Sequence, residues 1–439
     1  MKVMKFGGTS VGKPERMQQV IDLVIADPES KIVVLSALSG TTNALIEISQ
    51  LLSLGYKVPA KQKIDELENI YKQFVDDLLK TRRAKEDAGI IIAEHFDFLN
   101  IILKISYSEA LNKDILAQGE LLSTKLFCEA LRERHIEYRF LSALDFMCID
   151  ENEEPRLERI QRRLHVILKE FPEEKLFITQ GYICRNVREE IDNLKRGGSD
   201  YTASLIAAVT EASVCEIWTD IDGMHNNDPR VVEKTKPIEV LSFEEAAELA
   251  YFGAKILHPT CIWPTQQKNV PVRLLNTMQP QAAGTVIQQF AGSIGVKAIA
   301  AKDDIIAIKI KSSRMLLAHG FLRKIFEVFE KYKTSIDMVT TSEVAVAVTI
   351  DNDSRLIEIV QELEQFGTVE IEMNQTIVSI VGNEISKTDN VLNSLFNAIK
   401  SIPITMVNYG GSAHNISLLI PSNYKKETLQ KLNKGLFDL

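Results

Sequence analysis

The last third of the chain contains two segments that repeat one pattern about 70 residues apart. Each begins with an apolar run, IIAIKI at 305–310 and TIVSIV at 376–381, followed by a helical pattern and two more short apolar runs. A shared order of elements at this spacing favours a duplicated domain over a chance likeness. We predict that each copy folds as strand–helix–strand–strand–helix, a ferredoxin-like arrangement with helices on an antiparallel sheet.

The first half of the chain alternates short apolar runs with helical stretches. Continuous runs such as IVVL at 32–35 and LFIT at 176–179 are typical of strands buried on both faces. Each run ends in a polar loop that contains glycine, and a helical pattern follows. We therefore predict an α/β fold with a mostly parallel sheet flanked by helices, and a helical insertion over 56–112.

Composition excludes several classes of protein. The 439 residues include 51 Lys or Arg and 60 Asp or Glu, a net charge of −9, which argues against a dedicated nucleic-acid binder. No stretch approaches the roughly 18–20 apolar residues that a membrane span needs, and the N-terminus does not resemble a secretory signal. The five cysteines are scattered, which indicates reduced thiols in a cytoplasmic protein rather than a zinc site or disulfide framework.

Two loops combine cations with paired glycines before a helix: KFGGTS at 5–10 and KRGGSD at 195–200. Glycines let the backbone approach a ligand closely, lysine supplies a compact positive charge, and a helix N-terminus favours anions. Neither loop is a Walker A sequence, and no G-x-G-x-x-G follows a strand, so a dinucleotide dehydrogenase has no support. Each loop alone fits an ordinary turn, but the two together indicate an anion site.

Two further segments carry polar residues where ligands usually bind in α/β proteins. The loop 219–230 follows a predicted strand, and GAKILHP occupies 253–259. The loop lacks the spacing of a calcium site. No Ser/His/Asp or Cys/His constellation can be argued. We interpret His258 as structural, and His95, His135 and His165 as lying on solvated helix faces.

Taken together and in this order, the motifs resemble those of the aspartokinases of the amino acid kinase family, and the repeat resembles a pair of ACT domains. The resemblance implies a kinase domain over 1–288, a first ACT domain over 303–373, and a second made of 289–302 and 374–439. It implies no appended homoserine dehydrogenase unit. The matching pieces are KFGGTS (5–10), VLSALSGTTN (34–43), GE (119–120), QGY (180–182), RGGSD (196–200), TDIDG and DPR (within 219–230), GAKILHP (253–259) and SIDMVTTSE (335–343).

The resemblance implies transfer of the ATP γ-phosphoryl group to the β-carboxylate of L-aspartate, giving 4-phospho-L-aspartate. This reaction is the first step of lysine, threonine, methionine and diaminopimelate biosynthesis. A carboxylate is already ionised at pH 7, so the site needs charge neutralisation and in-line positioning rather than a base. We expect Mg²⁺ to bridge the phosphates and assign no residue as a metal ligand. Two alternatives stay open: another small-acid kinase of the family, or a non-catalytic amino-acid sensor.

The resemblance also implies roles for single residues. Lys5 should contact the transferring phosphate and Asp200 should hold Lys5, so these two are the predicted catalytic residues. Arg196 suits the α-carboxylate of aspartate, and Glu120 suits its α-ammonium. The other predicted aspartate-binding residues are Ser36, Thr42, Tyr182, Gly198 and Ser199. The nucleotide is expected to contact Lys5, Phe6, Gly7, Gly8, Thr219, Asp220, His225, Arg230, Lys255 and Ile256, with the two glycines donating backbone N–H groups.

The ACT pair implies feedback regulation, with lysine as the expected effector. Asp337 or Glu343 could bind the effector ammonium; alternatively, both are solvated ends of strands. Ala318 replaces a Ser often found in lysine-sensitive forms, so threonine or no effector stays open. Edge strands of such domains tend to pair across chains, and we expect a homodimer or a dimer of dimers. The predicted effector residues are Met315, Gly320, Phe321, Leu322, Ser335, Asp337, Thr341, Ser342 and Glu343.

Overall fold

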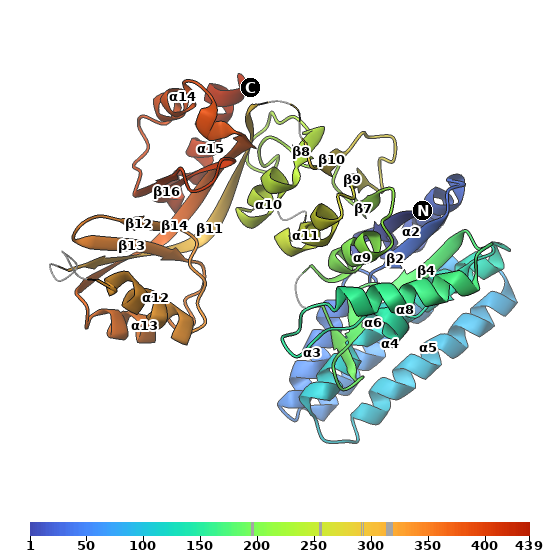
Figure 1. Ribbon diagram of the computed structural model, residues 1–439. Coiled ribbons are helices and arrows are strands. Elements are labelled where there is room, and N and C mark those ends of the chain that lie inside the picture. Colours follow the sequence, from blue (N-terminus) through green and yellow to red (C-terminus); the bar gives the residue numbers. More distant parts are fainter. Residues whose placement is uncertain (195–196, 254–256, 291, 293, 313–318) are drawn as a thin grey trace. The chain divides into compact units, whose positions relative to one another are not determined.

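The computed structural model describes residues 1–194, 197–253, 257–290, 292, 294–312 and 319–439 (Figure 1). The chain forms two compact units. The first contains Met1–Met224, Glu239–Phe243 and Ile256–Phe290. The second contains His225–Ile238, Glu244–Lys255 and Ala291–Leu439. The second unit therefore includes the predicted repeat and two earlier pieces of chain.

The first unit is built on an eight-stranded sheet in the order β3-β4-β2-β1-β7-β9-β10-β8. Neighbouring strands run parallel except at the β9–β10 pair, so the predicted mostly parallel sheet is confirmed. Every residue of β1, β2 and β4 is buried, which accounts for their continuous apolar runs. The strands are β1 (Lys2–Phe6), β2 (Lys31–Leu35), β3 (Arg139–Leu141), β4 (Leu176–Gln180), β7 (Cys215–Thr219), β8 (Val240–Ser242), β9 (Val272–Asn276) and β10 (Thr285–Gln288), with a separate hairpin of β5 (Ile183–Arg185) and β6 (Ile191–Asn193).

Helices cover this sheet, and the predicted helical insertion forms α4, α5 and the start of α6 (Figure 1). The apolar faces of α4 and α5 join the core beneath the sheet, because residues such as Ile64, Tyr71 and Phe96 pack in one cluster with Phe6 and Leu35. The helices of the first unit are α1 (Gly8–Val11), α2 (Pro14–Ala26), α3 (Thr41–Ser53), α4 (Lys57–Leu78), α5 (Arg82–Ile102), α6 (Glu109–Glu133), α7 (Ala143–Phe146), α8 (Leu157–Glu170), α9 (Gly198–Val209) and α11 (Pro259–Gln267).

One expectation for the first unit needs correction. His95 is not on a solvated face: it is buried in α5, and its Nδ1 lies 2.6 Å from Gln118 Oε1. Burial lowers the pKa of His95. His165 is exposed on α8, as predicted, whereas His135 is exposed but lies in the turn after α6. The helix after the first glycine loop is a single turn, α1, and the longer helix begins only at Pro14.

The second unit contains a six-stranded antiparallel sheet in the order β12-β13-β11-β14-β16-β15. The predicted repeat is confirmed, since β11–α12–β12–β13–α13 is followed by β14–α14–β15–β16–α15. The strands are β11 (Gly295–Lys311), β12 (Val339–Thr341), β13 (Ala345–Ile350), β14 (Thr368–Asn383), β15 (Met406–Tyr409) and β16 (Asn415–Pro421); the helices are α10 (Phe243–Tyr251, in this unit from Glu244), α12 (Phe321–Lys331), α13 (Leu356–Leu363), α14 (Val391–Ala398) and α15 (Lys425–Phe437).

The long strands β11 and β14 pair along almost their whole length, but the register shifts between Lys302 and Ile305. Two apolar cores form on this sheet. One gathers α12 and α13 around residues such as Ile308, and the other gathers α14 and α15 around residues such as Ile380 (Figure 1). Each copy of the repeat thus has its own core, while the central strands are shared.

Of the helices that the structure describes, none combines the length and the apolar character that crossing a membrane requires.

Candidate active site

The fold brings the two glycine loops together through an ion pair between Lys5 and Asp200. Lys5 lies near the carboxyl end of β1, and Asp200 lies in the first turn of α9. Lys5 Nζ is 2.6 Å from Asp200 Oδ1, and the two side chains are 10% and 18% exposed. A pair this shielded interacts more strongly than a solvated surface pair. The structure therefore positions one cation firmly at the carboxyl edge of the sheet, where ligands of α/β proteins bind.

The glycines in these two loops serve different purposes. A Cβ on Gly8 would lie 2.9 Å from the Ala37 carbonyl oxygen, so a side chain there would collide with backbone. Gly197 and Gly198 instead have φ angles of 78° and 47°, which glycine adopts without strain. The N–H of Gly7 donates to the Trp218 carbonyl at 3.3 Å. In this structure Gly7 therefore bonds the neighbouring strand, and its donation to a phosphate stays a prediction.

Glu120, on α6, is a buried carboxyl group with one unused oxygen. The residue is 4% exposed, and its Oε1 accepts the Ala37 N–H at 3.2 Å. Its Oε2 has no hydrogen-bond partner in the described part of the chain. Burial raises the pKa of Glu120 to about 7. A buried carboxylate of this kind is stabilised when a cation binds beside it.

Tyr182 lies in a strained turn close to Glu120. Its φ angle is 67°, its N–H donates to Thr202 Oγ1 at 2.9 Å, and its carbonyl accepts the Leu194 N–H at 2.8 Å. Burial, with a further contribution from the charge of Glu120, raises the pKa of Tyr182 to about 12. Sequence analysis missed Thr202, although it lies three residues after Ser199 and so on the same face of α9.

The remaining aspartate-binding candidates line the start of α3 and α9. Ser36 is half-buried just after β2, and its carbonyl accepts the Ser123 Oγ at 2.8 Å. Thr42 is half-buried in the first turn of α3. Ser199 is buried in the first turn of α9, so close to Gly181 that a Cβ there would meet the serine at 2.3 Å. Gly198 begins the same helix, and Arg196 lies outside the described residues.

The nucleotide candidates divide between the two units. In the first unit, Phe6 is buried and stacks on Trp218 with ring centroids 5.8 Å apart. Thr219 ends β7, and its Oγ1 donates to Oδ1 of the exposed Asp220 at 3.2 Å. Lys255 and Ile256 lie outside the described residues.

In the second unit, His225 and Arg230 lie on one polar segment. His225 Nδ1 is 2.8 Å from Thr235 Oγ1. The guanidinium of Arg230 binds Asp228 with two bonds of 2.9 and 2.8 Å while its side chain is 76% exposed. These hydrogen bonds hold the pKa of Asp228 below its usual value. The Arg230 guanidinium is thus held by Asp228 while most of its side chain remains exposed to solvent.

The predicted effector residues surround α12 and β12. Gly320, with φ 79°, begins α12, Phe321 is buried against Phe366, and Leu322 is 38% exposed. Met315 lies outside the described residues. The exposed members are Ser335, Thr341, Ser342 and Glu343.

Asp337 is not the solvated strand end that was one alternative. Its side chain is 1% exposed, and its Oδ1 accepts from Lys302 Nζ at 2.7 Å and Tyr251 Oη at 2.6 Å. Lys302 also binds Asp351 at 2.9 Å. Burial alone would lower the pKa of Lys302, but its hydrogen bonds to the two carboxylates outweigh burial and raise it. The second oxygen of Asp337 has no hydrogen-bond partner in the described part of the chain.

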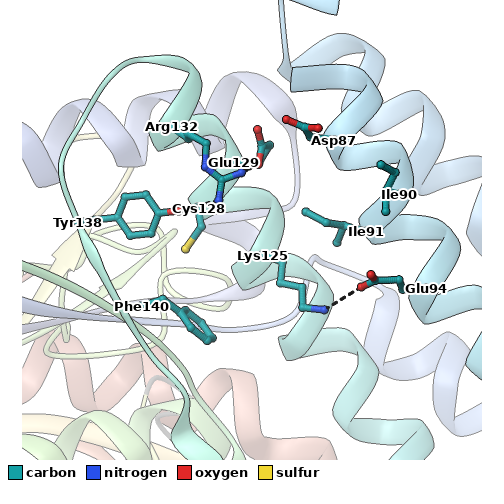
Figure 2. A pocket seen from close by; sticks show the side chains of 10 residues that line it. All are labelled: Asp87, Ile90, Ile91, Glu94, Lys125, Cys128, Glu129, Arg132, Tyr138 and Phe140. Carbon is teal, nitrogen blue, oxygen red and sulfur yellow. Dashed lines mark hydrogen bonds and ion pairs between the residues drawn. The ribbon is translucent and has the colours of Figure 1, made fainter. Parts of the chain in front are cut away.

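A cavity of about 540 Å³ between α5, α6 and the residues around β3 is separate from these candidates (Figure 2). Its two cations are engaged, Lys125 with Glu94 at 3.5 Å and Arg132 with Glu129. The cavity therefore suits a phosphate poorly, and no predicted site residue lines it. Its walls are formed by Asp87, Ile90, Ile91, Glu94, Lys125, Cys128, Glu129, Arg132, Tyr138 and Phe140.

Comparison with known proteins identifies the family. The amino acid kinase family matches residues 1–276, and an ACT domain matches residues 378–436. Lysine-sensitive aspartokinase 3 of Escherichia coli (strain K12) is 34% identical over 448 residues, which cover 99% of each chain. The chain belongs to the aspartokinase family. The predicted resemblance and fold class are thereby confirmed.

Solved aspartokinase structures agree with this membership. E. coli aspartokinase III in complex with aspartate and ADP has a TM-score of 0.86 at 33% identity and covers 100% of both chains. The same enzyme in complex with lysine and aspartate has a TM-score of 0.81 at 33% identity, covering 100% of this chain and 99% of that one. Among the residues described for the present aspartokinase, no group of three or more His, Cys, Asp or Glu side chains is arranged to hold a metal ion.

Proposed function

We propose that this aspartokinase transfers the γ-phosphoryl group of ATP to the β-carboxylate of L-aspartate and is inhibited by lysine. The observation that carries the proposal is the Lys5–Asp200 ion pair of 2.6 Å, which joins the two glycine loops at the carboxyl edge of the sheet. The product, 4-phospho-L-aspartate, would enter the biosynthesis of lysine, threonine, methionine and diaminopimelate.

The phosphoryl step needs charge neutralisation more than proton transfer. The aspartate β-carboxylate is ionised at neutral pH and can attack without a base. Lys5 would neutralise charge on the transferring group, and Asp200 would hold its ammonium in position. Mg²⁺ would neutralise charge on the ATP phosphates, and the exposed carboxylate of Asp220 at the end of β7 is suitably open to such a cation. The positive charge of Mg²⁺ would add to that of Lys5.

Aspartate would be recognised at both of its α-substituents. Glu120 has an unused buried oxygen for the α-ammonium, and the planar fork of Arg196 suits the α-carboxylate. Tyr182 lies close enough to Glu120 for that charge to help raise the pKa of Tyr182. Ser36, Thr42, Gly198 and Ser199 would complete the pocket.

Hydroxylamine trapping of the acyl phosphate tests the activity directly. Purified protein with ATP, Mg²⁺ and aspartate should form the hydroxamate, and glutamate in place of aspartate should give far less. Lys5→Ala should lower kcat by about a thousandfold, as loss of a donor to a developing charge does elsewhere. Equal use of glutamate would favour another small-acid kinase, and no product with either acid would favour a sensor.

The nucleotide would contact Lys5, the glycine loop at 5–10 and the polar segments 219–230 and 253–259. Arg230 offers an exposed guanidinium, held at its base by Asp228, that suits phosphate oxygens. Thr219, Asp220 and His225 would lie around the rest of the nucleotide, with Phe6, Gly7, Gly8, Lys255 and Ile256. Arg230→Ala should raise the KM for ATP and leave the KM for aspartate unchanged.

Regulation would act through the ACT pair, for which we propose the division 303–373 and 289–302 with 374–439, after a kinase domain of 1–288. The register shift between Lys302 and Ile305 and the two separate cores support this division. Lysine would bind between α12 and β12, near Asp337. Titrating lysine and threonine, singly and together, identifies the effector, and Thr341→Ile should abolish inhibition if the pocket is correct.

We further propose a homodimer or a dimer of dimers in the cytoplasm. β12 and β15 are the edge strands of the six-stranded sheet, and every residue of β12 is exposed, which leaves an edge for a second chain. All five cysteines are free, buried thiols, in keeping with a reducing compartment. Sedimentation equilibrium with and without lysine measures the oligomeric state.

A further inference from the structure

The segment His225–Ile238, which carries His225 and Arg230, is part of the second unit rather than the first. Within that unit it packs on α15 (Lys425–Phe437), the last helix of the chain. The contact is made by three buried asparagines: Asn226 and Asn227 on the segment, 4% and 3% exposed, and Asn433 on the helix, 1% exposed. Such fully buried amides are costly unless they are hydrogen-bonded.

The Asn433 side chain uses both of its polar atoms on this segment. Its Oδ1 accepts from Asn226 Nδ2 at 3.1 Å and from Asn227 Nδ2 at 3.3 Å. Its Nδ2 donates to the Lys234 carbonyl at 2.9 Å. One amide therefore fixes the segment at three points, on both sides of Arg230.

The hydrogen bonds continue from these asparagines to Arg230. Asn227 Oδ1 accepts the Asp228 N–H at 2.9 Å, and Asp228 Oδ1 accepts the Arg230 N–H at 2.9 Å. The Asp228 carboxylate then holds the guanidinium of Arg230. An unbroken series of contacts thus runs from Asn433 to the exposed guanidinium.

Apolar packing keeps the same segment on the helix. Val232 is 5% exposed and lies in one core cluster with Leu429 and Leu432 of α15. Asn227 Nδ2 also donates to the Leu429 carbonyl at 3.2 Å. The segment is therefore seated by burial, and the asparagines set its register on α15.

We propose that Asn433 is a positioning residue for nucleotide binding: it holds Arg230 in place through Asn227 and Asp228. This inference rests on the proposed role of Arg230 toward ATP and assigns a new contributor to that site, the last helix of the regulatory module. Asn433 would thus let α15 support nucleotide binding without a contact between that helix and the nucleotide.

The test compares the ATP KM with the aspartate KM in Asn433→Ala, and measures the binding of mant-ADP at equilibrium. Loss of the buried Asn433 amide and its three hydrogen bonds should raise the ATP KM and the mant-ADP Kd about tenfold. The aspartate KM should change by less than about twofold, because only one substrate's site has lost its support. Asn227→Ala should give the same pattern, and the double variant should be little worse than either single one.

Thr428→Val is the matched control, because Thr428 is buried on the same helix and bonds only its own Tyr424 carbonyl, at 2.8 Å, among the hydrogen bonds described. It should lower thermal stability and leave both KM values unchanged. Asn433→Ala with unchanged mant-ADP affinity, or with both KM values raised alike, would overturn the proposal. If Asn433→Ala does not fold, Asn227→Ala decides by the same criteria.

Arg230→Ala distinguishes a failure of the proposed role of Arg230 from a failure of the proposed role of Asn433. If it leaves mant-ADP affinity unchanged, the proposed role of Arg230 fails, and the inference about Asn433 fails with it. If Arg230→Ala weakens mant-ADP binding and Asn433→Ala does not, only the inference about Asn433 is wrong.

Discussion

Two buried carboxylates, Glu120 in the first unit and Asp337 in the second, differ in their partners. The Glu120 carboxylate accepts one hydrogen bond, from the Ala37 N–H, and forms no ion pair with any described residue. Asp337 is as deeply buried but already binds Lys302 and Tyr251. Both are predicted to bind the ammonium of an amino acid.

The difference in partners suits the two carboxylates to different purposes. The ammonium of a substrate should relieve the uncompensated burial of Glu120, because it would supply the counter-charge that no described residue provides. An effector ammonium at Asp337 must instead compete with partners that the protein supplies, or use the second oxygen. We therefore expect strong dependence on Glu120 and a tunable response at Asp337.

Among changes that test this comparison of the two carboxylates, Glu120→Gln is expected to have the largest effect. Removing this charge should raise the aspartate KM about a hundredfold, because the bound ammonium loses its buried counter-ion. The ATP KM should stay the same. Steady-state assays with each substrate varied in turn provide the measurement. A variant with normal aspartate KM would show that the ammonium binds elsewhere.

Asp337→Asn should have the next largest effect, on inhibition rather than on catalysis. We expect the lysine concentration for half-inhibition to rise about thirtyfold, as loss of a hydrogen bond to a charged group implies. Glu343→Gln tests the other predicted partner of the effector ammonium, since Glu343 belongs to the same segment and is exposed. Equal shifts in the two variants would argue against a special role for Asp337.

The aspartate KM should change about tenfold between pH 6 and 8. The carboxyl of Glu120 has a pKa of about 7 when buried. Below that pH it is protonated and cannot balance the ammonium, so the KM should fall as pH rises. The ATP KM should not follow this curve, and Glu120→Gln should flatten it.

The same shift links Glu120 to stability. Its pKa is raised on folding from 4.5 to about 7, so the folded state binds the extra proton and stability declines as pH rises across this range. Above pH 7 the cost is about 3 kcal/mol. Glu120→Gln should therefore be more stable than the parent at pH 8 and similar to it at pH 4.5, as measured by urea unfolding.

Tyr251→Phe is expected to give the smallest change. It removes one donor that competes for Asp337, so lysine should inhibit at about one third of the parental concentration. Lys302 still binds Asp337 in this variant, which keeps the effect small. Weaker inhibition by lysine would mean that Tyr251 supports the effector site instead of competing with it.

The sequence predicted what depends on local pattern. Buried strands such as 32–35 follow from continuous apolar runs, and the repeat follows from the order of its elements. Glu120 was found because its motif is local. The burial of Asp337 was not predictable, since Lys302 and Tyr251 come from distant segments. His95 was misjudged because charged neighbours in sequence lie on the other face of its helix.

The attachment of the segment 225–238 to α15 also has a consequence for the synthesis of the protein. Asn227 and Leu429 are bonded across 202 residues of chain. At about 5–20 residues per second, a ribosome needs about 10–40 s to make that interval. During this time the core around Val232 lacks the part that Leu429 and Leu432 of α15 supply. The segment that carries Arg230 thus becomes fully ordered only after α15 has been made, and ATP binding would begin only then.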